Sequence, residues 1–365
     1  MLQSTIETIG ISGFKSIKKL DNFRLNPLNI FIGANGVGKS NFISLFKMLS
    51  KIIDRELQEY VAVSGGADNL LHFGQKTTDS IEIRLMSQNN GYWCKLIPAE
   101  GDKLVFLGED ALFHNKQYPR PYAHSMGSGQ KESVIYETAK RKAVAKHVLE
   151  AMQSWKVYHF HDTSESAKIK KMGDIHDNAY LRPDASNLAT YLFLLKEKFS
   201  DYYRNIVETT RMVAPFFDDF VLRSSPLNRN KIQLEWKHKG SDAYFGSGAF
   251  SDGTLRFICI ATLLLQPDAN LPKTILLDEP ELGLHPYAIT LLASMLQSAS
   301  MKTQIIVSTQ SVTLVNQFKP EDIIVADRDD GQSNFRRLDE NEIKTWLDDY
   351  GLGDLWEKNI FGGRP

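Results

Sequence analysis

Few cysteines, almost no net charge and no long apolar run set the first limits on this chain of 365 residues. The two cysteines, Cys94 and Cys259, lie far apart in apolar surroundings, which is typical of buried thiols in a reduced chain and excludes a disulfide framework. The net charge of −1 excludes a bulk attraction to nucleic acid, so only local basic patches could bind phosphates.

The longest apolar stretch, residues 257–265, is about half as long as a bilayer span. The N-terminal MLQSTIETIG has neither the basic flank nor the apolar core of a signal sequence. We therefore expect a cytoplasmic location and no membrane segment. Sustained heptads are also lacking, which excludes a long coiled coil. For this length we predict an N-terminal lobe over 1–118, a helical insertion over 119–230 and a C-terminal lobe over 231–365.

What the chain does contain is a glycine-rich loop, GANGVGKS, placed between an apolar run and a helix-compatible stretch. Its glycines permit positive φ, so backbone N–H groups can turn inward, and the following helix directs its N-terminus at the same point. Lys39 is placed to reach the β and γ phosphates of a nucleotide, and Ser40 to bind magnesium. A glycine-rich turn with a chance lysine is the alternative. The predicted phosphate-binding residues are Gly33, Ala34, Asn35, Gly36, Val37, Gly38, Lys39, Ser40 and Asn41.

A second segment, TILLDEPELGLHP, supplies carboxylates that such a loop needs. A short apolar strand ends at Asp278 and Glu279, and the carboxyl end of a strand is where ligands bind in open α/β sheets. We predict that Asp278 holds magnesium and that Glu279 deprotonates the attacking water. The alternative is an acid pair at a helix start before Pro280, which leaves the upstream loop unexplained.

The order GANGVGKSN, FSDGTLRF, LLDEPELGLHP and IIVSTQS resembles the ABC-type ATPases of the SMC/RecF class. Among these it is similar to the stand-alone prokaryotic predicted ATPases near RecF and the OLD family, of the AAA_21 type. The resemblance implies an α/β fold of the ABC-type P-loop NTPases. That fold has a mixed central sheet, an antiparallel β-subdomain and an inserted helical arm or lid. ATP and Mg²⁺ are the implied cofactors.

Further site residues follow from this resemblance. Ser251 and Gly253 match the signature motif, which in the family closes the nucleotide of a partner subunit, so the site is complete only in a dimer. Ser251 also suits a plain helix N-cap. Lys15 and Ser16 match a family position near the phosphates and the base, although a solvated lysine is the simpler interpretation of Lys15.

Two glutamines complete the predicted site. The family usually has a histidine where this chain has Gln310, and an amide can bond a phosphate or water but carries no proton. Gln75 is a candidate for linking magnesium to the helical arm, and a polar turn before a strand is the alternative. We interpret His285, in the loop after Glu279, as structural.

The intervening sequence predicts the remaining elements. Period-two patterns indicate an antiparallel meander with a tight Asn-Gly turn. Proline, glycine and serine indicate an exposed mobile loop, and apolar residues three and four apart indicate helices. The predicted ranges are strands over 81–85, 92–96, 104–106 and 232–236, a loop over 119–133, and helices over 133–155 and 187–213.

Weaker patterns leave alternatives open. His159, His161 and His176 suggest a metal site, but no third ligand stands at a spacing typical of such sites. Two basic clusters could contact nucleic acid, or could be solvated faces. Asp327 and Asp329 superficially resemble the acids of a TOPRIM nuclease, but the tail is too short, so we predict a last core strand. The last 15 residues, GLGDLWEKNIFGGRP, contain an aromatic residue, Trp356, followed by a terminal Gly-Gly-Arg-Pro. The clusters are Lys140, Arg141, Lys142 and Lys146, and Lys168, Lys170 and Lys171.

The favoured hypothesis is an ATP-driven switch that dimerises around two nucleotides. It would form a homodimer or higher even oligomer and control DNA or an effector encoded nearby, such as a nuclease acting in trans. DNA repair and antiviral defence are the expected settings. Two other classes stay open: the nucleotide-binding subunit of a transporter, and a nucleotide-binding scaffold that does not hydrolyse ATP.

Overall fold

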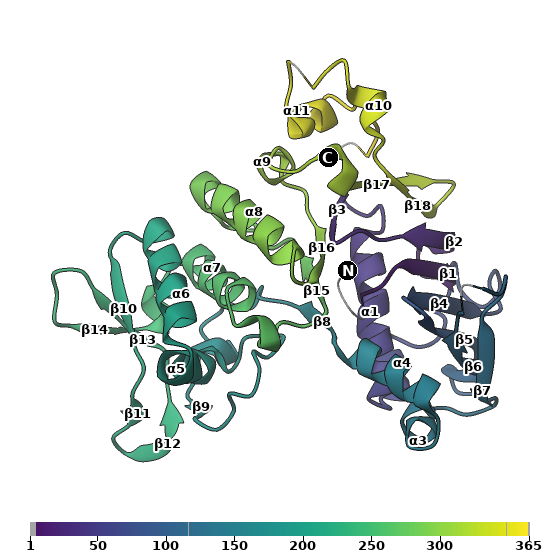
Figure 1. Ribbon diagram of the computed structural model, residues 1–365, viewed down its shortest axis with the longest axis horizontal. Coiled ribbons are helices and arrows are strands. Elements are labelled where there is room, and N and C mark those ends of the chain that lie inside the picture. The colour runs from purple at the N-terminus through teal and green to yellow at the C-terminus, as the bar shows by residue number, and fades with distance from the viewer. Residues whose placement is uncertain (1–4, 116, 348, 364–365) are drawn as a thin grey trace.

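A computed structural model describes residues 5–115, 117–347 and 349–363 of the chain. Arg364 and Pro365 of the C-terminal motif lie outside the described residues. Figure 1 shows an antiparallel sheet on one side of a central group of strands and helices α5, α6 and α7 on the other side. No helix in the described ranges has the length and apolar character needed to cross a membrane.

The central sheet has the strand order β18-β17-β3-β16-β15-β8. Neighbours from β17 to β8 are parallel, and β18 is antiparallel to β17. Helices cover both faces, which explains the continuous apolar runs of its inner strands. The strands are β3 (Leu28–Ile32), β8 (Trp155–Tyr158), β15 (Thr274–Asp278), β16 (Gln304–Ser308), β17 (Ile323–Asp329) and β18 (Gln332–Arg337). This mixed sheet confirms the predicted fold class.

The antiparallel sheet has the order β2-β1-β4-β5-β6-β7 and contains the predicted meander. The predicted turn is wrong in position. Gln88 and Asn89 form it, with Gln88 at φ 54°, whereas Asn90 and Gly91 already belong to β5. Ser87 pairs with Asn90, so the period-two pattern sets the register and the turn follows from it. The strands are β1 (Thr8–Phe14), β2 (Ile17–Arg24), β4 (Ile81–Ser87), β5 (Asn90–Ala99), β6 (Lys103–Phe113) and β7 (Tyr122–Gly127).

The loop predicted over 119–133 is wrong, because β7 lies within it and pairs with β6. Its end is held by Glu109, whose fully buried carboxylate accepts hydrogen bonds from the Ser133 hydroxyl and, at 3.1 Å, from the Val134 N–H. Tyr92 donates a third hydrogen bond to the same carboxylate at 2.8 Å. Buried donors therefore fix a segment whose composition suggested a loop.

Helices on the side of the antiparallel sheet are α1 (Lys39–Ile53), α2 (Leu57–Val63), α3 (Ile135–Ala139) and α4 (Ala143–Gln153). The helix predicted over 133–155 is therefore two helices, interrupted at residues 140–142, and Trp155 begins β8. Apolar residues of α1 and α4 share a core with the antiparallel sheet and with Leu276 and Ile306 of the central sheet. This core holds α1, and hence the loop before it, against the sheet.

The other side holds α5 (Leu188–Lys198), α6 (Ser200–Val213), α7 (Asp252–Leu264) and α8 (Pro286–Ser300). The helix predicted over 187–213 breaks at Phe199, which has φ −138° and ψ 53°. The strand predicted over 232–236 is also two strands. The short strands, in the orders β10-β13-β14 and β11-β12-β9, are β9 (Gly173–Asp174), β10 (Phe217–Val221), β11 (Ser224–Ser225), β12 (Asn228–Ile232), β13 (Glu235–His238) and β14 (Tyr244–Gly246).

The domain division stays a prediction. Within the range 119–230, α5 and α6 belong to a second hydrophobic core, which they share with α7 and α8. β8, in the same range, is a strand of the central sheet. The 3₁₀ helices are η1 (Lys168–Lys170), η2 (Ser247–Ala249), η3 (Asp268–Asn270) and η4 (Pro320–Asp322).

The C-terminal segment adds α9 (Val312–Val315), α10 (Glu340–Ile343) and α11 (Leu352–Glu357) and folds back onto β17. Trp356 is fully buried and its indole N–H donates to the Gly363 carbonyl. The Gly363 N–H donates to Asp327 at 2.7 Å, so this acid has a structural partner. A Cβ on Gly363 would lie 2.7 Å from a Val325 methyl, and its φ is 64°, so glycine is required there.

Candidate functional site

The glycine-rich loop connects β3 to α1 and has the conformation that its sequence predicts. Gly33, Gly36 and Gly38 have φ values of 150°, 79° and 110°. A Cβ on Gly33 would lie 2.4 Å from the Ala326 carbonyl oxygen. A Cβ on Gly38 would lie 2.0 Å from the Ser333 hydroxyl. Glycine is thus needed at both positions for backbone conformation and for close approach.

Lys39 lies inside this loop and is 5% exposed. Its ammonium group donates to the carbonyl oxygens of Gly33 at 2.5 Å and Ala34 at 3.0 Å. Burial lowers the Lys39 pKa, whereas the nearby carboxylates of Glu279 and Asp278 act in the opposite direction. The cation of one predicted motif therefore lies within electrostatic reach of the acids of the other.

The sheet order explains why segments distant in sequence meet here. β16 lies between β3 and β15, so residues that follow β16 separate the loop from the acids. The Ser308 hydroxyl donates to Asp278, and the Gln310 amide donates to Glu279. Glu279 has a φ of 43°, and its N–H donates to the Ser308 carbonyl at 2.9 Å. Parallel strands thus bring the predicted base and Gln310 into contact.

Glu281 is a third carboxylate at this edge that the sequence did not single out. It is 8% exposed, and its Oε1 accepts hydrogen bonds from the Thr309 hydroxyl and, at 3.2 Å, from the Gln310 N–H. Its Oε2 has no hydrogen-bond partner among the described residues. Burial raises the Glu281 pKa, and the charge of Glu279 adds to this rise. The only sequence signal was its place in the acidic segment, which does not reveal burial.

Lys15 and Ser16 reach the first turn of α1. Ser16 accepts a hydrogen bond from the Asn41 amide at 2.7 Å, and its hydroxyl oxygen lies 2.6 Å from the Ser333 hydroxyl oxygen. Lys15 donates to Ser44 at 3.1 Å, and burial lowers its pKa. Ser333 comes from β18, and its hydroxyl donates to the Val37 carbonyl at 2.5 Å. Sequence reasoning missed this serine because no local pattern marks it.

Ser251 and Gly253 lie at the N-terminus of α7. The exposed Ser251 accepts a hydrogen bond from the Thr254 N–H at 3.2 Å, so its capping role is confirmed. A Cβ on Gly253 would lie 2.2 Å from the Gly283 carbonyl oxygen in the loop after Glu279. Arg256 donates to Leu282 at 2.8 Å and to His161 at 2.9 Å. Figure 1 places α7 and α1 on opposite sides of β15 and β16.

The hydrogen bonds of Gln75 go to residues outside the predicted site. Its side chain is in an exposed turn and donates to Asp102 at 3.4 Å, and its N–H donates to Asp68 at 2.7 Å. Its hydrogen bonds go to neither Ser40 nor Asp278, which the structure also describes. His285 caps α8, where its Nδ1 accepts from the Tyr287 N–H at 3.4 Å.

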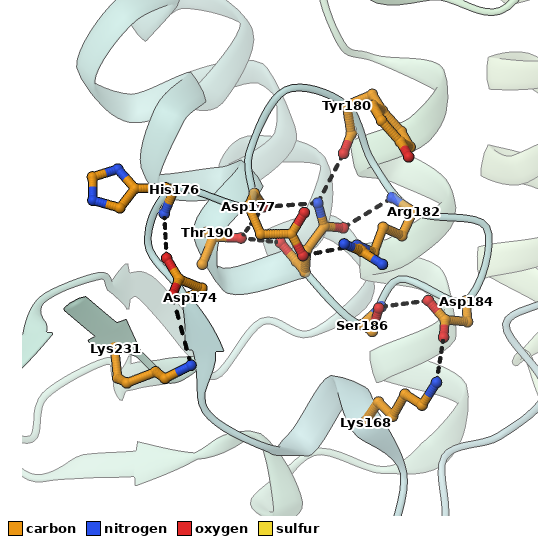
Figure 2. A network of polar contacts seen from close by, with 11 residues as sticks. Lys168, Asp174, His176, Asp177, Tyr180, Arg182, Asp184, Ser186, Thr190 and Lys231 are labelled. Atoms are coloured by element: carbon orange, nitrogen blue, oxygen red, sulfur yellow. Dashed lines mark hydrogen bonds and ion pairs between the residues drawn. The ribbon is translucent and has the colours of Figure 1, made fainter. Parts of the chain in front are cut away.

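The histidine metal-site hypothesis is wrong. His159 and His161 are near one another, with ring centroids 6.3 Å apart, but His176 lies on an exposed turn with its ring directed away from the surrounding polar contacts (Figure 2). In residues 5–115, 117–347 and 349–363, no three His, Cys, Asp or Glu side chains gather to hold a metal ion. Spacing in sequence did not anticipate that 162–187 forms a separate loop.

Polar contacts fold that loop against α5 (Figure 2). Asn187 donates to the carbonyls of Asp177 at 3.0 Å and Tyr180 at 2.8 Å. Arg182 pairs with Asp177 at 2.7 Å. The Pro183 carbonyl accepts a hydrogen bond from the His159 N–H at 2.9 Å, so the loop also contacts the end of β8.

Parts of the basic clusters have acidic partners. Lys168 pairs with Asp184 at 3.7 Å, and Lys140 pairs with Glu137 at 2.9 Å. These pairs are solvent-exposed and contribute little to stability. Contact of these clusters with nucleic acid stays a prediction.

His159 gives the fold a pH dependence. It follows β8, whose Tyr158 pairs with Leu277 beside the predicted acids. Burial, with a smaller effect of the Lys47 charge, lowers its pKa from 6.5 to about 4. A depressed histidine pKa contributes stability above pH 6.5 that is lost as the pH falls towards 4. We expect the free energy of unfolding, measured with urea, to fall less over this window in His159→Gln than in the wild type. Parallel curves for the two proteins would contradict this prediction.

Comparison with known proteins gives a family match for part of the chain. A family model described as "AAA domain, putative AbiEii toxin, Type IV TA system" (AAA_21) matches residues 141–316. The matched range contains Ser251, Asp278, Glu279 and Gln310 but not the glycine-rich loop. No curated protein matches the chain.

Two solved structures are similar over nearly their whole length. One is an SmcHead bound to the C-winged helix domain of ScpA, with a TM-score of 0.57 and 17% identity, covering 93% of this chain and 99% of that chain. The other is an Smc head domain with an extended coiled coil, bound to the C-terminal domain of ScpA derived from Pyrococcus furiosus. Its TM-score is 0.55 and its identity 16%, with 94% of this chain and 98% of that chain covered. At these identities the likeness concerns the fold.

Proposed function

We propose that this chain, an ABC-type ATPase with the fold of an SMC head, hydrolyses ATP in a homodimer and thereby controls a second protein or DNA. The observation that carries this proposal is the arrangement at the sheet edge. Lys39, Glu279 and Gln310 gather there, whereas Ser251 is exposed and its side-chain hydrogen bonds stay within its own helix. In this proposal one subunit would supply a binding and activating half-site at the sheet edge and, elsewhere, the exposed N-terminus of α7.

ATP would be held by the glycine-rich loop and by Lys39. The loop backbone and the N-terminus of α1 favour phosphate groups, and the buried ammonium group would neutralise their charge. Ser16 and Asn41, which are hydrogen-bonded to one another, border the same helix start. Adjacent Lys15 would extend the site towards the rest of the nucleotide.

Magnesium fits the oxygen donors at this edge. Ser40 offers a hydroxyl and Asp278 a carboxylate, and Mg²⁺ prefers such oxygen ligands together with phosphates and water. Bound Mg²⁺ would neutralise charge on the β and γ phosphates. The observed contacts of Gln75 lie elsewhere and do not support its role as a further link.

Glu279 is the proposed general base. Its carboxylate accepts a hydrogen bond from Gln310, which would orient it towards the attacking water without competing for the proton. Ser251 and Gly253 of a second subunit would close the γ-phosphate from the opposite side. The N-terminus of α7 suits that role because its N–H groups favour an anion, and Gly253 allows α7 to pack against the loop that follows Glu279.

The partner is proposed to be an effector such as a nuclease acting in trans, or DNA, in repair or antiviral defence. A head of this fold bound to a separate protein has a precedent in the SmcHead structure with ScpA. The exposed Lys171 and the half-buried Lys170 are candidate phosphate contacts for DNA. We propose a cytoplasmic location, which agrees with the two buried, unpaired cysteines.

A comparison of the wild type with Lys39→Ala tests this function. We expect magnesium-dependent phosphate release and ATP-dependent dimerisation in the wild type, measured with a phosphate assay and light scattering. Because hydrogen bonds to charged groups are strong, Lys39→Ala should weaken ATP binding by about 10- to 100-fold. Lys319→Ala, an exposed lysine that pairs with Glu321, is the matched control. Equal phosphate release by the wild type and Lys39→Ala would refute the proposal.

A further inference from the structure

The buried carboxyl group of Glu281 has no role in the function proposed so far, although it lies beside the proposed base. Only Pro280 separates it from Glu279 in the sequence, and it is 8% exposed. A carboxyl group is buried only at a cost that hydrogen bonds must offset. Here its contacts lead to a single place, the segment that follows β16.

Glu281 contacts this segment through one oxygen atom. Its Oε1 accepts from the Thr309 hydroxyl and from the Gln310 N–H, the latter at 3.2 Å. Thr309 is fully buried, and its N–H donates to the Phe31 carbonyl of β3 at 3.0 Å. The Thr309 hydroxyl also accepts from the Ser311 N–H at 3.0 Å. The carboxyl group and β3 therefore hold the backbone of residues 309–311 from two sides.

The side chain of Gln310 emerges from this held backbone and donates to Glu279. Glutamine has several rotatable bonds, so its amide can meet the carboxylate reproducibly only if the backbone beneath it is fixed. We propose that Glu281 is a positioning residue for hydrolysis: it anchors Thr309 and Gln310 so that the Gln310 amide stays on the proposed base Glu279. This inference rests on the proposed ATPase function and adds a residue to its machinery.

The second carboxyl oxygen supports a role beyond packing. Oε2 is buried without a hydrogen-bond partner among the described residues, a costly arrangement that natural folds usually avoid. An apolar residue at this position would avoid that cost but would leave the Gln310 N–H and the Thr309 hydroxyl without their acceptor. The unpartnered oxygen is therefore a cost of keeping Oε1 in place.

Two substitutions separate anchoring from charge. Glu281→Gln retains an acceptor oxygen for Thr309 and Gln310 and removes only the charge, so we expect turnover within about 3-fold of the wild type. Glu281→Ala removes the acceptor. Because a small displacement near the reacting atoms can cost about 100-fold, we expect kcat to fall by about 10- to 100-fold. The Kd for ATP should stay within about 3-fold, since the contacts of Glu281 do not include the glycine-rich loop.

Amide hydrogen exchange at Gln310 supplies a readout that needs no turnover. We expect exchange at Gln310 to be about 10-fold faster in Glu281→Ala and nearly unchanged in Glu281→Gln. The matched control is Glu109, another buried carboxylate that accepts from a hydroxyl and a backbone N–H. Glu109→Ala should lower Tm and leave Gln310 exchange and kcat per folded molecule unchanged.

The outcomes distinguish this inference from the proposed function. If the amide of Gln310 exchanges in Glu281→Ala at the same rate as in the wild type, Glu281 does not anchor this segment. Faster exchange without any loss of kcat would refute the positioning role, and a parallel loss of Tm, ATP affinity and kcat would show a merely structural residue. A wild-type protein that releases no phosphate would instead refute the proposed function, whatever the exchange rates show.

Discussion

Glu279→Gln is expected to reduce phosphate release by about 10²- to 10⁴-fold, the usual contribution of a general base. The substitution keeps an acceptor oxygen for the Gln310 amide and therefore preserves the local hydrogen bond. ATP affinity should stay within about 3-fold of the wild-type value, because the residue is not part of the glycine-rich loop. Single-turnover phosphate release and equilibrium binding of a fluorescent ATP analogue measure the two quantities.

The control for this substitution is Glu321→Gln. Glu321 precedes β17, at the edge of the central sheet opposite to Glu279, and pairs with Lys319 at 3.8 Å. It should have wild-type turnover. If Glu279→Gln releases phosphate as fast as the wild type, Glu279 is not the base. If neither the wild type nor Glu279→Gln releases phosphate, the nucleotide has a purely structural role.

A mixture of two inactive variants is expected to recover activity if the site is shared between subunits. Lys39→Ala disables the phosphate loop, and Ser251→Asp keeps a good N-cap while placing a negative charge towards the partner's γ-phosphate. Each variant alone should lose about 100-fold in turnover. In a random mixture half of the dimers are mixed, and each mixed dimer has one intact site, so roughly a quarter of the wild-type activity should return.

Controls for the mixing experiment follow from the same symmetry. Lys39→Ala mixed with Glu279→Gln should recover nothing. Lys39 and Glu279 belong to the same half-site, so each subunit of a mixed dimer has a damaged copy of it and neither composite site is intact. Phosphate release by the Lys39→Ala and Ser251→Asp mixture equal to the mean of the separate proteins would contradict a composite site. Ser251 would then be only the N-cap that its contact with Thr254 already shows.

The fold was largely predictable because its strongest signals are local. The apolar run before Gly33 and the run ending at Asp278 are both buried strands, and the parallel sheet puts their ends at one edge. The helix breaks were less visible. Phe199 leaves the helical conformation between α5 and α6, and no proline or glycine marks that point. Tertiary packing decides such a break, and propensity alone does not show it.

The site was predictable where a motif specifies the chemistry and hidden where only the fold creates the contact. Lys39, Asp278 and Glu279 were recognisable from spacing and residue type. Ser333 and Glu281 were not, since the first arrives from β18 and the second depends on the burial of an otherwise ordinary acid. Gln75 was chosen because its residue type fits the chemistry, and its role at the site stays a prediction; the contacts that its turn makes are with Asp68 and Asp102.

The position of β3 in the central sheet has a consequence for folding during synthesis. β3 lies between β16 and β17, so both of its hydrogen-bonded edges are completed only by residues 304–308 and 323–329. During synthesis the apolar strand before the glycine-rich loop therefore stays unpaired until nearly the whole chain has been made. Pairings so distant in sequence form slowly, and exposed strand edges are prone to aggregation. The strand that leads into the glycine-rich loop is therefore among the last to be paired.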